Sequence, residues 1–266
     1  MANPKVSVLM AVHNGLPHVG AAIESVLAQT FKDFEFLIYD DGSTDGTPQL
    51  LAGLHDPRVR VVRHERAGLT VTLNRGIEAA RGLYLARLDA DDLCLPERLE
   101  RQVAYLDANL DATLVCSRVS WIDENGAKLA DWPADVATLT PEAIRVVLPR
   151  ENCIAHSSVV VRTSVLKRRG YNPRARAGQD YERWLALVSS GGQIHKLAEP
   201  LVVMRQRAAS VTHASQGAAW NRKNVVARLL CLEEAVTHGR ISSFELRVAT
   251  AAAVDATKLA LKTLFN

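Results

Sequence analysis

Two acidic clusters follow apolar stretches of the chain and could hold a divalent cation. Asp40 and Asp41 follow one such stretch, and Asp89, Asp91 and Asp92 follow another. Carboxylates crowded on a short turn repel one another unless a cation or hydrogen-bond donors offset their charge. Mg²⁺ and Mn²⁺ take oxygen ligands, often one or two carboxylates together with phosphate oxygens. The clusters therefore suit a hard cation that binds together with a phosphate-bearing ligand.

Each cluster also has a purely structural explanation. Asp, Gly, Ser and Thr favour turns and helix N-caps, and helices are expected to begin at Pro48 and near Pro96. Thr47 is the expected N-cap of the first helix, with Pro48 at its first position. Capping accounts for Thr47 but not for two adjacent carboxylates directly after an apolar strand. Spacing alone therefore leaves both explanations open.

Alternating strands and helices are expected to position the clusters. β-branched and apolar runs predict strands, and apolar residues at helical spacing predict the helices between them. The strands are expected at 5–12, 34–39, 59–62 and 83–88, and the helices at 17–29, from 48 and at 69–80. This alternation predicts a doubly wound, mostly parallel α/β sheet. In such sheets ligands bind beyond the carboxyl ends of the strands, where both clusters lie.

The pattern changes after residue 96. A helix is expected at 96–109, strands at 113–116, 119–122 and 156–161, helices at 163–169 and from 180, and two helices within 218–266. Asn125-Gly126 predicts a turn after the second of these strands. No internal repeat or long linker interrupts the chain. We therefore expect one main domain at 1–215, with halves at 1–105 and 106–215, and a C-terminal helical appendage at 216–266.

Composition excludes several other classes of protein. The chain has 266 residues, 48% of them hydrophobic and 23% charged, which fits a globular protein with a buried core. A net charge of +3 without a long basic block argues against a nucleic-acid partner. Four widely spaced cysteines predict free thiols rather than a metal cluster or disulfides. No apolar run reaches the ~18–20 residues of a transmembrane segment, and the N-terminus lacks a signal region, so a cytoplasmic location is expected.

Five blocks in this order resemble family 2 glycosyltransferases. They are residues 6–14, 25–31, 40–47, 73–77 and 86–92, the last followed closely by 95–99. The resemblance extends over residues 4–210 and is strongest up to 105. It implies the GT-A fold, in which a nucleotide-sugar-binding sheet joins an acceptor-binding part. It also implies inverting transfer of a sugar from a nucleoside-diphosphate sugar, by default a UDP-sugar, to a hydroxyl acceptor in cell-surface polysaccharide or glycoconjugate synthesis.

The resemblance gives the acidic residues specific roles. Asp41 would contact the base of the nucleotide, and Asp40 would help to shape that pocket. Asp89-Ala90-Asp91 matches the DxD motif, so Asp91 would ligate Mg²⁺ or Mn²⁺ and Asp89 would lie near the ribose or a metal-bound water. The metal would offset charge that develops on the leaving diphosphate. Asn74, in the block beside the nucleotide, is a further nucleotide-sugar-binding candidate.

The resemblance assigns the catalytic base to Asp180. An inverting transfer needs a base that accepts the proton of the acceptor hydroxyl. Residues 178–184 resemble the segment where the family often has Glu-Asp before an apolar helix, although Gln179 replaces the Glu here. A helix N-cap is the structural alternative for Asp180. His156 matches a position where relatives often have His, and either a place in the cleft or a structural role is expected for it.

Arg205 and Arg207 are candidate contacts of the donor diphosphate. They lie in a segment where the family often has Tyr-Arg-x-His, and Arg207 stands at the His position. A guanidinium cannot ligate a metal, but it can pair bidentately with phosphate.

The residues after 216 lie outside the resemblance. Their abundant apolar residues predict packing on the main domain. Homo-oligomerisation through these helices and peripheral contact with the inner face of the membrane remain as alternatives.

Two other functions remain to be weighed. A nucleotidyltransferase would usually have a glycine-rich, basic loop after its first strand, whereas residues 11–15 contain one glycine and no Lys or Arg. A non-catalytic nucleotide-sugar-binding partner in a polysaccharide assembly is disfavoured because Asp41, Asp89, Asp91 and Asp180 are all present.

Overall fold

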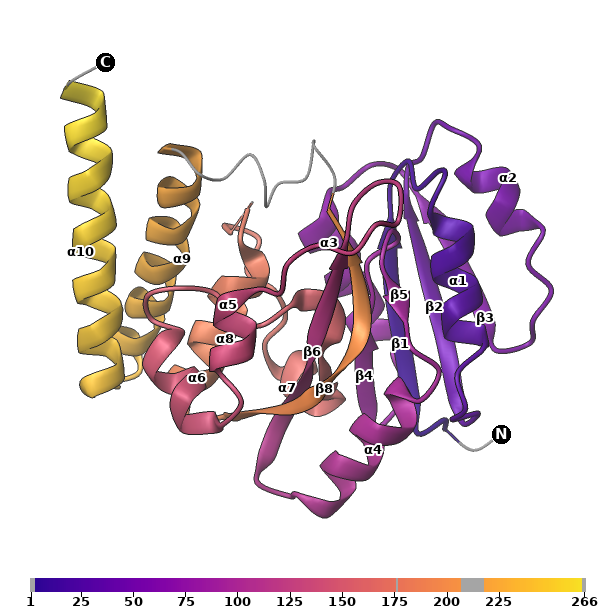
Figure 1. Cartoon of the computed structure of the whole chain (residues 1–266), viewed down its shortest axis with the longest axis horizontal. Helices are drawn as coiled ribbons and strands as arrows, with labels where there is room; N and C mark the ends of the chain where they lie inside the picture. The colour runs from indigo at the N-terminus through magenta and orange to yellow at the C-terminus, as the bar shows by residue number, and fades with distance from the viewer. Residues whose placement is uncertain (1–2, 176, 207–217, 265–266) are drawn as a thin grey trace.

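A computed structural model of the chain describes residues 3–175, 177–206 and 218–264. Within these residues, eight strands form one mixed sheet in the order β3-β2-β1-β4-β7-β6-β8-β5 (Figure 1). The strands are β1 (Val6–Val12), β2 (Phe34–Asp41), β3 (Val59–His64), β4 (Tyr84–Arg87), β5 (Leu93–Cys94), β6 (Ala112–Ile122), β7 (Val160–Arg162) and β8 (Gln193–Arg205). The strands β1 to β4 run parallel, so their carboxyl ends meet at one edge of the sheet.

Helices cover both faces of this sheet. They are α1 (Val19–Leu27), α2 (Thr47–Ala52), α3 (Leu69–Ala79), α4 (Arg98–Ala108), α5 (Pro133–Ala137), α6 (Pro141–Val147), α7 (Thr163–Arg168), α8 (Gln179–Ser189), α9 (Ala218–Thr237) and α10 (Ser243–Leu264), with a 3-10 turn, η1 (His156–Ser158). Buried residues of α1 and α4 belong to one core cluster. Those of α3, α7 and α8 belong to a second cluster. The predicted doubly wound α/β fold is confirmed.

The central strand β1 shows why the sequence adopts this layered fold. Val8 and Met10 belong to the first core cluster, whereas Leu9 and Ala11 belong to the second. Successive side chains of a strand point to opposite faces. A strand with helices on both faces must therefore be apolar at every position, which explains the uninterrupted apolar run.

The C-terminal helices share the core of the main sheet. α9 packs against α8, and α10 packs against α9, at the end of the molecule far from α2 (Figure 1). Ala227 and Phe244 lie in the same buried cluster as residues of α3 and α8. Within the described part of the chain, no helix combines the length and the apolar character needed to cross a membrane. The expected packing is therefore observed, while the domain boundary near 215 stays a prediction.

Three local predictions are wrong. Thr47 is not an N-cap: Gly46 holds that position, and the Thr47 hydroxyl accepts the Gly15 N–H at 2.9 Å. The two strands expected at 113–122 form the single strand β6, because its irregular pairing with β8 passes through residues 117 and 118 without ending the strand. Residues 156–158 form a 3-10 turn rather than the start of a strand.

Two glycine substitutions should change stability in opposite directions. A Cβ at Gly76 of α3 would overlap the buried side chain of Leu9, so Gly76→Ala should lower the free energy of unfolding by about 1–3 kcal/mol. Gly20 of α1 meets only Leu50 Cδ1 at 3.5 Å, and Gly20→Ala should raise stability by up to about 1 kcal/mol. Urea denaturation of both variants checks the pair. Equal effects would contradict the close packing of α3 on β1.

Candidate active site

A cavity of about 1210 Å³ brings together residues from distant parts of the chain. Among the predicted site residues, its lining includes Asp89, Asp91, Asp180 and Arg205. These residues come from the segment after β4, from α8 and from the end of β8. The fold thus unites the acidic motif and the expected base, which lie about 90 positions apart in the chain, at the edge of the sheet where ligands bind.

The first acidic cluster lies behind the wall of this cavity. The Asp41 carboxylate accepts the backbone N–H groups of Ala67 at 2.6 Å and Gly68 at 3.0 Å, and both of these residues line the cavity. Asp40 is fully buried and accepts the Ser43 N–H at 2.9 Å. Gly42 makes the turn between them, with φ of 68°. Both carboxylates therefore shape the loops around the cavity, and a contact of Asp41 with a nucleotide base stays a prediction.

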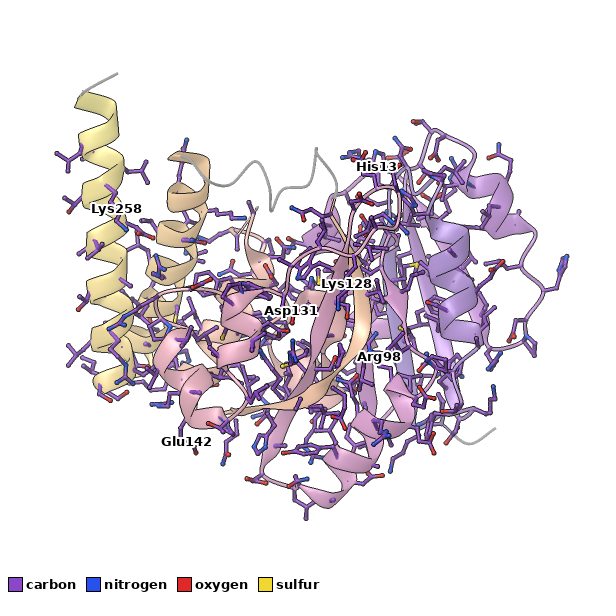
Figure 2. All side chains as sticks on the ribbon, viewed as in Figure 1. His13, Arg98, Lys128, Asp131, Glu142 and Lys258 are labelled. Carbon is purple, nitrogen blue, oxygen red and sulfur yellow. The ribbon has the colours of Figure 1, made fainter. Side chains whose placement is uncertain are left out.

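The loop after β1 is attached to the loop after β2. His13, labelled in Figure 2, donates from Nδ1 to the carbonyl oxygen of Asp41 at 2.9 Å. Asn14 has a positive φ of 51°, and its Oδ1 accepts the Thr44 N–H at 2.8 Å. An Asn side chain tolerates this left-handed conformation because it can hydrogen-bond to nearby backbone. These bonds fix the turn that carries Asp40 and Asp41.

The second acidic cluster surrounds a buried arginine. Arg87 is 1% exposed, forms an ion pair with Asp89 and donates from Nη1 to Ser157 Oγ at 3.2 Å. Ser157 Oγ also accepts the Asp89 N–H at 3.0 Å and lies within hydrogen-bond distance of the carboxyl groups of Asp89 and Asp92. Burial acts to raise the pKa of Asp89, but the charge and hydrogen bond of Arg87 outweigh it and hold the pKa below its ordinary value.

The pKa of Asp92 shifts in the opposite direction to that of Asp89. Burial, and then the charges of Asp89 and Asp91, raise the pKa of Asp92 to about 8. The raised pKa favours the protonated form of Asp92, and its Oδ1 accepts the backbone N–H of Arg205 at 3.0 Å. These residues do not cap α4, because Glu97 stands at its N-cap. The structural explanation by helix capping is thus wrong for this cluster.

The acidic cluster fits a hard cation of the Mg²⁺ or Mn²⁺ type. Among the described residues, no group of three or more His, Cys, Asp and Glu side chains could hold a metal by itself. Such a cation needs only one or two carboxylates when phosphate oxygens complete its coordination. Asp91 and Asp89 are both partly exposed and both line the cavity, so these two carboxylates of the motif could ligate such a cation.

Asn74 holds a loop beside the cavity. Its Nδ2 donates to the Tyr171 carbonyl oxygen, and its Oδ1 accepts the Tyr171 N–H, both at 2.8 Å. The Tyr171 hydroxyl lies 2.7 Å from Nε2 of His156, which lines the cavity. Burial, and then the charge of Arg87, hold the pKa of His156 well below its ordinary value, so its ring is neutral. Asn74 thus contacts backbone in this structure, and its binding of the donor stays a prediction.

Asp180 lies in the first turn of α8 and lines the cavity. Gly178, in the left-handed conformation with φ of 73°, is the N-cap, so Asp180 does not cap the helix. Its Oδ2 accepts a hydrogen bond from Asn152 Nδ2 at 3.0 Å. Burial raises the pKa of Asp180, while the Tyr181 backbone N–H, the charge of Lys223 and the Asn152 hydrogen bond act to lower it. A carboxylate with a raised pKa is suited to accept a proton.

The two arginine candidates differ in what the structure describes. The Arg205 guanidinium donates to the carbonyl oxygens of Asp123 at 3.2 Å and Glu124 at 3.3 Å, and Arg205 also lines the cavity. Arg207 lies outside the described residues. Contact of either residue with a diphosphate stays a prediction.

Several residues of the site were missed from the sequence. Arg87, Ser157, Asn152 and Lys223 contact predicted site residues or line the same cavity. An arginine next to a DxD motif at the end of an apolar strand signals a buried countercharge. The other residues give no such signal, because their partners lie tens of residues away in the chain.

Comparisons with known proteins agree on one family. The model of "Glycosyl transferase family 2" matches residues 7–170. An uncharacterized glycosyltransferase of Methanocaldococcus jannaschii is 32% identical over 210 residues, which cover 77% of this chain and 72% of that protein. The putative glycosyltransferase EpsE of Bacillus subtilis is 31% identical, with 77% and 74% covered. The O-antigen biosynthesis glycosyltransferase WbnJ of Escherichia coli is 33% identical, with 69% and 72% covered.

A solved structure is similar in fold. The S. aureus TarS fragment 1–349 in complex with UDP-GlcNAc matches with a TM-score of 0.68 at 18% identity. The match covers 85% of this chain and 66% of that chain, so the present chain spans just under two thirds of its length. The GT-A fold expected from the sequence is thereby confirmed.

Replacing Asp41 with its amide should loosen the cavity wall. In Asp41→Asn, an NH₂ group would face the Gly68 N–H in place of the oxygen that accepts it at 3.0 Å, and only the longer 3.2 Å contact with the remaining oxygen would be kept. We expect a loss of about 1.5–3 kcal/mol in the free energy of unfolding, as for a hydrogen bond to a charged group. Urea denaturation measures it, with Asp33→Asn at an exposed turn position as the control. A variant as stable as this control would show that the carboxylate does not hold the loop.

Proposed function

Because this chain belongs to glycosyl transferase family 2, we propose that it is a metal-dependent inverting enzyme that uses a UDP-sugar. The sugar passes to a hydroxyl acceptor in the synthesis of a cell-surface polysaccharide or glycoconjugate. The observation that carries this proposal is the shared cavity, which is lined both by the acidic DxD residues and by Asp180. Donor activation and acceptor deprotonation need such groups on opposite sides of one substrate site.

The choice of donor and pathway is supported by similar proteins. The TarS fragment of similar fold was solved with UDP and with UDP-GlcNAc. WbnJ is named for O-antigen biosynthesis, and ExoO of Rhizobium meliloti, 42% identical over 106 residues, is named for succinoglycan biosynthesis. A pyrimidine nucleotide and a surface glycan are therefore the first candidates for this chain.

Asp91 and Asp89 would hold the divalent cation, as their chemistry and place in the cavity suggest. The bound cation supplies positive charge to the departing diphosphate. Asp180 would accept the proton of the acceptor hydroxyl, and Asn152 would orient its carboxylate through the 3.0 Å hydrogen bond. The walls formed by Ala67 and Gly68, which Asp41 holds in place, would exclude water from the nucleotide side.

The cation site can be tested by binding alone. Titration calorimetry with UDP, TDP and GDP, with and without Mn²⁺, should reveal one preferred pyrimidine diphosphate whose binding Mn²⁺ strengthens. Asp91→Asn should abolish the strengthening by Mn²⁺, because it replaces one of the two carboxylates that would hold the cation. Asp111→Asn, at an exposed position, serves as the control. If wild-type protein binds none of the three diphosphates, the assignment of a nucleoside-diphosphate sugar as donor is refuted.

Asp180→Asn should separate binding from catalysis. The amide keeps the shape of the side chain but cannot accept a proton, so UDP affinity should be retained. Release of UDP from UDP-glucose, UDP-galactose or UDP-GlcNAc, with water or oligosaccharides as acceptors, should fall on the order of 10²–10⁴-fold. The wild-type enzyme and the variant are compared with the donor that wild type turns over. A wild-type rate in Asp180→Asn would refute the assignment of the base.

A further inference from the structure

The helix α9 forms part of the cavity that contains the acidic motif. Lys223 and Asn224, near its start, line this cavity together with Asp180. Lys223 is half-buried, and Asn224 is buried. The match to the family model ends at residue 170, far before this helix. The start of α9 thus supplies part of the wall of the site.

A buried arginine fixes the position of α9. Arg228 is 1% exposed and lies five residues after Lys223 on the same helix. Its Nε donates to the Pro149 carbonyl oxygen at 2.8 Å, and its Nη1 donates to Asp255 of α10 at 2.6 Å. The hydroxyl of Tyr181, the residue after Asp180, donates to the carbonyl oxygen of Leu148 at 2.8 Å. α8 and α9 are therefore anchored to the same turn of the chain.

This anchoring brings a positive charge toward Asp180. Burial lowers the pKa of Lys223, whereas the charge of Asp180 acts to raise it. Burial raises the pKa of Asp180, and the charge of Lys223 acts to lower it. Tyr171 interacts electrostatically with Asp180. The other charged or titratable groups of the described chain that line the cavity with Asp180 are the acidic residues after β4 and Arg87, Glu151, His156, Tyr181 and Arg205. Backbone N–H groups and the Asn152 side chain favour the ionised form of Asp180 through hydrogen bonds, and Lys223 favours it through its positive charge.

We propose that Lys223 is a positioning residue for the catalytic base: its ammonium group, carried into the cavity by α9, favours the ionised carboxylate of Asp180. This inference rests on the proposed function only for its kinetic consequence, because the interaction itself exists without substrate. When the ammonium group is removed, one of the effects that lower the pKa of Asp180 is lost, and the effect of burial, which raises this pKa, is opposed less strongly. The carboxyl group then holds its proton to higher pH, and transfer is lost as the pH falls through a higher value than in wild type.

The direct test measures the titration of Asp180 in the full chain without ligand. The ¹³C carboxyl resonance of Asp180, assigned by its absence in Asp180→Asn, is followed from acid to neutral pH. In Lys223→Met the midpoint should rise by on the order of one pH unit, the lower end of the effect of a neighbouring opposite charge. Lys223→Arg keeps the charge and should stay near wild type. Arg222→Met, at the exposed neighbouring position, is the matched control.

The kinetic test uses the same variants with the UDP-sugar that wild type turns over. The acid limb of the rate profile should move upward in Lys223→Met by the same interval, about tenfold in rate on that limb per pH unit. The rate should recover at higher pH and in Lys223→Arg, whereas a purely structural defect would lower it at every pH. If Lys223→Met fails to fold, Lys223→Gln takes its place.

The outcomes of the two tests are distinguishable. An unchanged titration of Asp180 in Lys223→Met overturns the role of Lys223, whatever the enzyme does. A wild-type chain that releases no UDP from any donor overturns the proposed function, while the resonance still reports on Lys223. A raised midpoint together with a shifted acid limb supports both.

Discussion

The ion pair between the buried Arg87 and the partly exposed Asp89 is the interaction on which the site depends. A buried, unpaired charge is very costly, so the Arg87 guanidinium requires the Asp89 carboxylate. Arg87 lies at the end of β4, beneath the acidic turn, and Ser157 from the opposite half of the chain joins the pair. The guanidinium thus allows three carboxyl groups to be placed within four residues. Together with burial, which is the larger cause, it holds the pKa of His156 well below its ordinary value and so keeps a competing positive charge out of the cavity.

A second buried arginine supports the first. Arg98, at the start of α4 and labelled in Figure 2, donates from Nη2 to the carbonyl oxygens of Arg87 at 2.8 Å and Val159 at 3.2 Å. It is fully buried, and its Nε donates to Gln102 at 3.0 Å. β4 and the segment before β7 are therefore tied together at the point where the parallel strands give way to antiparallel ones. The charged residues of this region act as structural ties as much as catalytic groups.

The sequence predicts the donor half of the fold well because its signals are local. β1, α3 and β4 follow from apolar runs and helical spacing, and the acidic motifs lie directly at strand ends. The second half depends on strand pairings that the local sequence pattern does not indicate. β8 includes Glu199 and Pro200, and its register with β6 shifts near that point, so no strand pattern is visible there. The roles of Ser157, Asn152 and Lys223 likewise arise from tertiary contacts, which the spacing of residues along the chain does not predict.

The backbone bond from Arg205 to Asp92 spans 113 positions, and this has a consequence for the order of synthesis. A ribosome delivers the donor-side strands first, and an N-terminal unit generally begins to fold before the rest of the chain appears. The acidic turn nevertheless lacks its last hydrogen-bond donor until β8 has emerged and paired beside β6. A nascent chain can therefore build most of the nucleotide-side sheet early, while the active site is completed only after β8 has been synthesised.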